Sequence, residues 1–294
     1  MKKKMVLGIL VVLVLAMLAC ATTGIKDEPS RQTKIALVLG AGAAKGFAHI
    51  GVIKVLEMNK VPIHMIIGTS AGSAVGSLYA YGYNAFQLQQ LALTIEKKDV
   101  VDLVLPDNGF IKGDKIEEFI NKTLNNTPME KLKIPFYAVA ADIQSGQEIV
   151  FGRGNTGQAV RASCSIPGIF RPVKIGDRMY VDGGIVSPVA VDAAKRLGAN
   201  IVIAVDISAG GDRTQPTSTI ETIFQTYSIM YAKLASIQIS KADVVIRPKV
   251  GFISSSDFSK RHEAVMEGEK AAMEILPYLM QIINKLKEEG KLEK

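Results

Sequence analysis

The chain has 294 residues, 48% of them hydrophobic and 21% charged, so it is long enough to bury one large core and favours a single domain of catalytic size. Its formal net charge of +7 falls to +4 when the three lysines of residues 1–19 are set aside. The remaining chain has no run of five basic residues and no tryptophan, so we expect no nucleic-acid partner. Its two cysteines are too few for a disulfide framework.

The first twenty residues have the pattern of an export signal. Three lysines at residues 2–4 precede residues 5–19, which are apolar apart from Gly8. Because a bilayer span needs about twenty apolar residues, this segment favours a signal peptide over the alternative, a transmembrane helix. The segment ends in Met17-Leu18-Ala19-Cys20, which resembles the lipobox of bacterial lipoproteins, where the cysteine is acylated and becomes the first residue.

We therefore expect residues 1–19 to be a lipoprotein signal peptide, residues 20–33 a polar tether and residues 34–294 one domain. Acyl chains contribute about 0.8 kcal/mol per buried CH₂, and more than one chain gives stable anchoring. An acylated Cys20 would thus hold the protein on a membrane that it does not span. The expected location is the cell envelope, on the non-cytoplasmic side of that membrane.

From Lys34 onward, short apolar runs alternate with segments of helical spacing, which predicts an α/β fold with a parallel sheet. We expect Asp114 to cap its helix and Pro277 to kink or restart the last one. The expected strands cover residues 35–39, 65–67, 136–141, 148–151, 179–181, 201–206 and 244–246. The expected helices cover residues 47–60, 71–82, 114–124, 157–163, 188–197, 220–240 and 258–287.

The strongest chemical motif is Gly68-Thr69-Ser70-Ala71-Gly72, a G-x-S-x-G that follows a short apolar strand and precedes a helix of small residues. A serine on a sharp strand-to-helix turn exposes its hydroxyl, and Gly68 and Gly72 remove side chains that would collide there. The start of the helix also favours developing negative charge. This context makes Ser70 the candidate nucleophile, against the alternative of a tight turn with a capping serine.

The second motif is the glycine-rich loop Gly40-Ala41-Gly42-Ala43-Ala44-Lys45-Gly46, which also joins a strand to a helix and exposes backbone N–H groups. Such a loop can hold a dinucleotide or can bind the oxyanion of a tetrahedral intermediate. A dinucleotide site usually has an acidic residue about twenty positions further on that binds the ribose, and none occurs between Glu57 and Glu96. The oxyanion hole is therefore favoured, and Lys45 is expected to support the loop, to meet a phosphate or to be a solvated surface lysine.

The third motif is Asp182-Gly183-Gly184, at the end of an apolar strand. Asp-Gly-Gly is ordinary turn chemistry by itself, but a serine nucleophile needs a base, and the histidines are poorly placed for that role. His49 lies in the helix after the glycine-rich loop and His64 precedes a buried strand. His262 remains the one alternative base.

Together these motifs resemble the patatin-like phospholipase family, over most of residues 34–286. In that family the loop is usually G-G-G-x-[RK]-G, the elbow G-x-S-x-G and the base D-G-[GA]. Ala41 and Ala43 depart from the pattern, because glycine is usual at both positions. The matching segments here are Ala41–Gly46, Gly68–Gly72 and Asp182–Gly184, and two further similar stretches are Arg161–Phe170 and Ser187–Val189.

The resemblance implies a three-layer α/β/α fold with a mainly parallel central sheet and hydrolysis of acyl esters in lipids or phospholipids, without metal or cofactor. It implies that Asp182 takes the proton of Ser70 without help from a histidine. The N–H groups of Gly42, Ala43 and Ala44 would bind the oxyanion. Alanine still donates an N–H, so the hole survives if no alanine needs a positive φ, and activity comes into question if one does.

Two other functions stay open at this point. One is a Ser-His-Asp α/β-hydrolase built from Ser70, Asp206 and His262, which occur in the chain order typical of that fold. The other is an inactive lipoprotein that binds lipids or a partner through the same fold, because a fold does not by itself establish turnover.

Overall fold

The computed structural model describes residues 32–105, 108–208 and 215–292. The expected signal peptide, Cys20 and nearly all of the tether lie outside these residues. Within them, no helix is long and apolar enough to cross a membrane. The described strands are β1 (Ile35–Leu39), β2 (Met65–Thr69), β3 (Phe136–Asp142), β4 (Glu148–Phe151), β5 (Val173–Ile175), β6 (Arg178–Asp182), β7 (Ile201–Val205) and β8 (Val244–Ile246).

The described strands form one sheet whose centre is parallel, as expected. Strands β3, β2, β1, β7 and β8 run parallel to one another, whereas β4, β5 and β6 pair antiparallel. The parallel order follows from the strand–helix alternation, because each parallel connection needs a crossover, usually a helix. The carboxyl ends of the parallel strands therefore share one edge of the sheet, where loops can gather a functional site.

The register of β3 explains how the site is assembled. Ala138 pairs with Gly68 on one side and Phe151 on the other, and Ala140 pairs with Asp182 and Ile149. Strand β4 thus lies along one side of β3, while β2 and β6 lie end to end along the other side. Because β2 runs parallel to β3 and β6 antiparallel, their carboxyl ends meet. The residues that follow these ends are brought together by backbone pairing.

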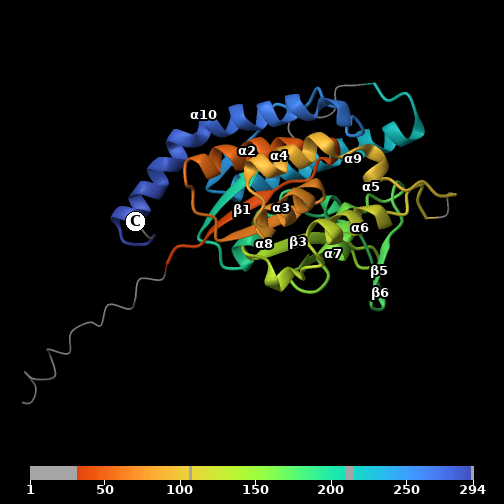
Figure 1. Cartoon of the computed structure of the whole chain (residues 1–294), viewed down its shortest axis with the longest axis horizontal. Helices are drawn as coiled ribbons and strands as arrows, with labels where there is room; N and C mark the ends of the chain where they lie inside the picture. The colour runs from red at the N-terminus through yellow and green to blue at the C-terminus, as the bar shows by residue number, and fades with distance from the viewer. Residues whose placement is uncertain (1–31, 106–107, 209–214, 293–294) are drawn as a thin grey trace, which may run out of the picture.

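Helices cover both faces of the sheet, which gives the expected three layers (Figure 1). The side chains of β1 alternate between two cores: Ile35, Leu37 and Leu39 enter one, and Ala36 and Val38 the other. The first core also holds α2 (Ala48–Met58), α3 (Ala71–Tyr81), α4 (Ala85–Thr94), α6 (Asp114–Thr123), α7 (Thr156–Cys164) and α10 (Arg261–Glu288); the second holds α8 (Val191–Arg196) and the end of α9 (Thr219–Gln238). Short helices complete the described chain: η1 (Ala43–Phe47), α5 (Lys97–Val100), η2 (Met129–Lys131), η3 (Gly183–Ile185), η4 (Ile239–Lys241) and η5 (Phe258–Lys260).

One expectation about helix ends is wrong, and a second is wrong in part. Asp114 is the first residue of α6 and not its cap; its carboxylate pairs with Arg161, and the Asp102 carboxylate accepts the N–H groups of Gly113 and Lys115 instead. Of the two outcomes expected at Pro277, a kink or a restart of the last helix, the restart does not occur, because α10 continues through the proline. Proline lacks the N–H of one helical hydrogen bond, but Ala272 before it and Leu279 and Ile283 after it are buried in the first core, which holds both parts of α10 in place.

Candidate active site

Ser70 lies on a sharp turn between β2 and α3. Its backbone has φ 54° and ψ −124°, which is a strained conformation for any residue with a side chain. The turn is held because the Ser70 N–H donates to Ser163 Oγ at 2.9 Å, while Ser163 Oγ donates to the Val139 carbonyl at 2.6 Å. A Cβ on Gly68 would lie 2.4 Å from Ser73 Cα, and one on Gly72 would lie 2.0 Å from the Leu39 carbonyl. The two glycines are therefore required by close backbone packing.

The hydroxyl of Ser70 donates directly to Asp182 Oδ2 at 2.5 Å, and both residues are buried. The other carboxylate oxygen, Oδ1, accepts the Gly184 N–H at 2.7 Å. A Cβ on Gly183 would lie 2.3 Å from the Val139 carbonyl, so the chain can turn away after the acid only with glycine there. The direct contact expected from the Asp-Gly-Gly motif is thus present.

The electrostatics of Asp182 suit a base that works near neutral pH. Burial raises the pKa of its carboxyl group from 3.8 to about 7, and the hydrogen bonds from Ser70 and Gly184 oppose this rise. An ordinary aspartate, ionised far below pH 7, would be too weak a proton acceptor for a serine hydroxyl. Desolvation is therefore the feature that adapts this carboxylate to the task.

The glycine-rich loop offers two free N–H groups beside this pair. The N–H of Ala41 donates to the Pro188 carbonyl at 2.8 Å, and that of Ala44 donates to the Ser255 carbonyl at 3.1 Å. Ala44, expected as a third oxyanion donor, is therefore engaged elsewhere. Within the described residues, the N–H groups of Gly42 and Ala43 have no acceptor, so these two remain as donors for an oxyanion.

Ala43 adopts φ 49°, in the left-handed region, whereas Ala41 has no positive φ. The condition that an alanine of this loop should not need a positive φ is therefore met at Ala41 but not at Ala43. An alanine there is strained relative to glycine by roughly 1 kcal/mol, which the surrounding fold must offset. Its N–H is still present. Lys45 is only 2% exposed, so the solvated surface lysine is excluded and a role in holding the loop is favoured.

The cavity that contains Ser70 is lined by none of the three histidines and not by Asp206. His49 is buried, and its Nε2 donates to the Gly40 carbonyl at 2.8 Å; burial lowers its pKa to about 4, so it is neutral and supports the loop. His64 Nδ1 accepts the Ile35 N–H, which fixes the start of β1. The His262 side chain is exposed at the start of α10, and Asp206 accepts the hydroxyl and N–H of Ser208. The geometry gives no support to the triad.

A cavity of about 340 Å³ leads to Ser70. Its wall includes Ala43 of the glycine-rich loop, so Ser70 and a residue with a free N–H group line the same space. Most of its lining is apolar and comes from the helices of the first core. The apolar side chains from these helices include Val75, Leu78, Leu88, Leu91, Phe119 and Ile120; Ile166 and Ile169 after α7 and Phe224 of α9 also line the cavity. An apolar cavity that ends at a serine and its base is suited to a long hydrocarbon chain with an ester at one end.

Known proteins identify the family of this site. Residues 37–195 match the family model described as patatin-like phospholipase. This chain belongs to the patatin-like phospholipase family. It is 32% identical over 208 residues to an NTE family protein of Mycobacterium tuberculosis, a match that covers 68% of this chain and 58% of that protein. It is also 33% identical over 186 residues to a lysophospholipase of Debaryomyces hansenii, covering 61% of this chain and 12% of that protein.

The chain thus spans less than two thirds of the length of these relatives. Among solved structures, VipD from Legionella pneumophila is similar over 84% of this chain and 67% of its own, with a TM-score of 0.58 and 13% identity. That likeness shows a shared fold.

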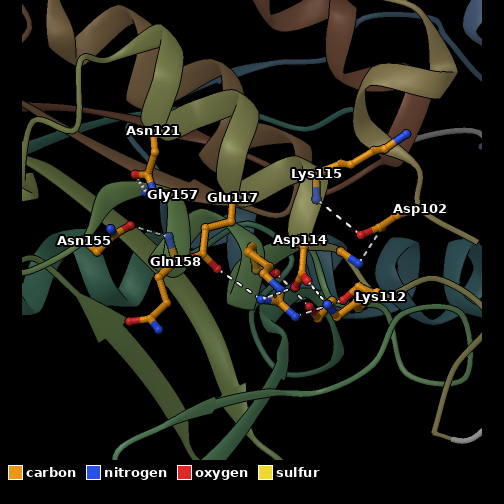
Figure 2. Close-up of polar contacts among 12 residues, drawn as sticks. Asp102, Lys112, Asp114, Lys115, Glu117, Asn121, Asn155, Gly157 and Gln158 are labelled. Carbon is orange, nitrogen blue, oxygen red and sulfur yellow. Dashed lines mark hydrogen bonds and ion pairs between the residues drawn. The ribbon is translucent and has the colours of Figure 1, made fainter. Parts of the chain in front are cut away.

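One wall of the cavity in this patatin-like domain is fixed by polar contacts between α6 and α7 (Figure 2). Arg161 of α7 pairs with Asp114 and Glu117 of α6 at 2.8 and 3.1 Å, and Lys112 also pairs with Asp114. Further along, Asn121 Oδ1 accepts the Gly157 N–H at 3.0 Å. Gly157 allows the two helices to approach closely, because a Cβ at this position would lie 2.5 Å from the Glu117 carbonyl.

Sequence motifs did not reveal every residue of the site. Ser163, which holds the elbow, lies in the Arg161–Phe170 stretch that resembles the family, but its role follows only from the structure. The segment after Asp182 is bound to the other motifs as well, because the Ser187 carbonyl accepts from Thr69 Oγ1 at 2.9 Å. Cys164 is half-buried in the cavity wall, with Sγ 3.8 Å from Ser73 Oγ.

Proposed function

We propose that this chain is a lipid acyl hydrolase, a phospholipase or esterase, that cleaves acyl esters through Ser70 and Asp182. The observation that carries this proposal is the 2.5 Å contact between the serine hydroxyl and a buried carboxylate at the end of an apolar cavity. Membership of the patatin-like phospholipase family supports it. The relative from Debaryomyces hansenii, which is named a lysophospholipase, points to the same class of substrate.

The proposed reaction has two steps. Asp182 accepts the hydroxyl proton of Ser70 while the oxygen attacks the ester carbonyl, and the N–H groups of Gly42 and Ala43 bind the oxyanion. Collapse of this intermediate expels the alcohol, which takes the proton from Asp182, and leaves the acyl group on Ser70. Water then gives a proton to Asp182 and attacks the acyl-enzyme, after which Ser70 regains its proton and the fatty acid leaves.

The cavity predicts a preference for longer acyl chains. Each CH₂ buried from water contributes about 0.8 kcal/mol, so kcat/KM for nitrophenyl esters should rise by up to about fourfold per added CH₂ until the cavity is full. Val75, which is partly exposed in the cavity wall, is a position at which a larger side chain would fill part of the cavity. Val75→Phe should depress kcat/KM for long chains and leave the acetate ester unchanged. A flat chain-length profile in the wild type would contradict a lipid acyl substrate.

A second candidate function, an inactive lipid-binding protein, is favoured by one observation: the left-handed backbone of Ala43. If this strain moved the loop away from the intermediate, the cavity could still hold an acyl chain. The two functions differ in turnover, so equal background rates in the wild type and in Ser70→Ala on several lipid classes would favour the binding protein.

We propose further that the mature chain starts at Cys20 and is held on a membrane of the cell envelope by acyl groups. The basic and apolar leader and the lipobox-like Met17–Cys20 support this proposal. Cells fed a labelled fatty acid should incorporate it into the wild-type protein, and Cys20→Ser should abolish the incorporation and release the protein from membranes. Unchanged labelling of Cys20→Ser would exclude this anchor.

A further inference from the structure

Tyr231 of α9 lies directly behind the catalytic carboxylate. Its side chain is 4% exposed, and its ring packs on Gly184, where a Cβ would lie 2.4 Å from the ring carbon Cζ and 2.7 Å from the hydroxyl oxygen. Gly184 is the residue whose N–H binds Asp182 Oδ1. The hydroxyl of Tyr231 therefore faces the carboxyl group across a glycine that leaves room for it.

The position of this hydroxyl is not explained by packing. It is buried, and within the described part of the chain it has no well-formed hydrogen bond. A buried hydroxyl without a partner is costly, and a phenylalanine would fill the same space without that cost. A polar group at this place is therefore expected to act on the group that it faces, which is Asp182.

We propose that Tyr231 is a positioning residue for the Ser70–Asp182 pair, whose hydroxyl donates a hydrogen bond to the carboxylate whenever Asp182 is ionised. This inference rests on the proposed function of that pair. Ser70 and Gly184 each supply one donor to the carboxylate, at Oδ2 and Oδ1. Tyr231 supplies a third donor from the opposite layer, so that a fully buried charge is better solvated by fixed dipoles.

The titratable groups around the carboxylate fit this role. Cys164 faces it from α7, and Tyr227 and Tyr231 face it from α9. Burial raises the pKa of Cys164 to about 12 and that of Tyr231 well above 10, so both groups stay protonated near neutral pH. Burial also raises the pKa of Tyr227. A tyrosine that stays protonated can only donate to the carboxylate, and donation favours the ionised form.

The pH dependence of Ser70 reactivity tests this inference. The full-length chain is treated with a fluorophosphonate between pH 5 and pH 9, and the second-order labelling rate is compared between wild type and Tyr231→Phe. Loss of the donor should raise the apparent pKa of the acid limb of the profile by about one unit, because one hydrogen bond to the charged carboxylate is lost. The rate at pH 6 should then fall by about tenfold, with little change at pH 9.

Tyr227→Phe is the matched control, because it removes the same hydroxyl from the neighbouring ring of α9, 5.8 Å away between centroids. It should leave the acid limb in place. In an Asp182→Asn background, Tyr231→Phe should have no further effect on the profile, since the titrating partner is gone. A merely structural role for Tyr231 would lower the rate equally at all pH values, so an unmoved acid limb in folded Tyr231→Phe overturns the inference.

Labelling needs only a reactive serine, so the result does not depend on the lipid substrate. If the acid limb moves while no lipid ester is hydrolysed by the wild type, the proposed function fails and the role of Tyr231 stands. If lipid esters are hydrolysed and the limb does not move, the proposed function stands and the role of Tyr231 is wrong.

Discussion

Replacement of Ser70 by alanine should lower the hydrolysis of both nitrophenyl and lipid esters to the background rate. The alanine removes the atom that forms the acyl-enzyme, and the remaining oxyanion donors cannot replace a nucleophile. We expect a loss on the order of 10⁴-fold or more, limited by the sensitivity of the assay. Initial rates on the purified full-length protein, with thermal melting to show that the variant is folded, give the measurement.

Ser77→Ala is a matched control for this loss. Ser77 is a buried serine like Ser70, but it lies within α3 and its hydroxyl donates to the Ala74 carbonyl of the same helix. Its replacement should leave the rate near that of the wild type. A folded Ser70→Ala that keeps most of the wild-type activity would remove Ser70 from the mechanism.

Replacement of Asp182 by asparagine should reduce kcat/KM by about 10² to 10⁴, the usual contribution of a general base. The amide keeps the shape of the carboxylate, and its oxygen can still accept from Gly184, but it cannot take the proton of Ser70. In the wild type the rate should rise with pH and level off above about 7, because Asp182 must be ionised to act as a base. The rate of the asparagine variant should not show this rise with pH.

The matched control is His262→Ala, which should change the rate little because that side chain is exposed to solvent. Loss of activity in His262→Ala together with a fully active, folded Asp182→Asn would replace the Ser/Asp pair by a triad.

Thermal melts of Asp182→Asn also carry information. The folded-state pKa of Asp182, about 7, lies above its ordinary value of 3.8, so the folded protein binds this proton more tightly than the unfolded chain. The stabilisation that the protonated Asp182 carboxyl gives the folded protein is present at low pH and is lost as the pH rises from about 4 through 7. Relative to the wild type, Asp182→Asn should therefore gain stability across this range.

The contact between Ser70 and Asp182 was easier to predict from the sequence than the sheet that holds the two residues. Ser70 and Asp182 each lie at the end of an apolar strand with glycines beside them, and such local patterns can be recognised without knowledge of the tertiary structure. The direction of β6 was not predicted, because alternating apolar residues do not distinguish parallel from antiparallel strands. A signal was present: Gly176 and Asp177 alone separate β5 from β6, and Gly176 has φ 64°, typical of a two-residue hairpin turn.

Other parts of the site had weaker signals or none. Helix α4 was missed although Asn84 and Gln87 form a capping box at its start, a pattern that is visible in the sequence. The engagement of the Ala44 N–H depends on a carbonyl at Ser255, more than two hundred residues away. Tyr231 lies in no motif and contacts Gly184 only because α9 packs against η3, which follows Asp182. Contacts of this kind depend on the packing of layers, which the local sequence does not encode.

Mass spectrometry of the intact protein after treatment with a fluorophosphonate tests most directly whether Ser70 is an activated nucleophile. The wild type should gain one adduct, located by peptide mapping on the segment that contains Ser70. Ser70→Ala should gain none, and Asp182→Asn should gain it more slowly by about 10² or more, because the base no longer takes the proton. A folded wild type that gains no adduct, or an adduct that persists in Ser70→Ala, would contradict a Ser70–Asp182 acyl hydrolase.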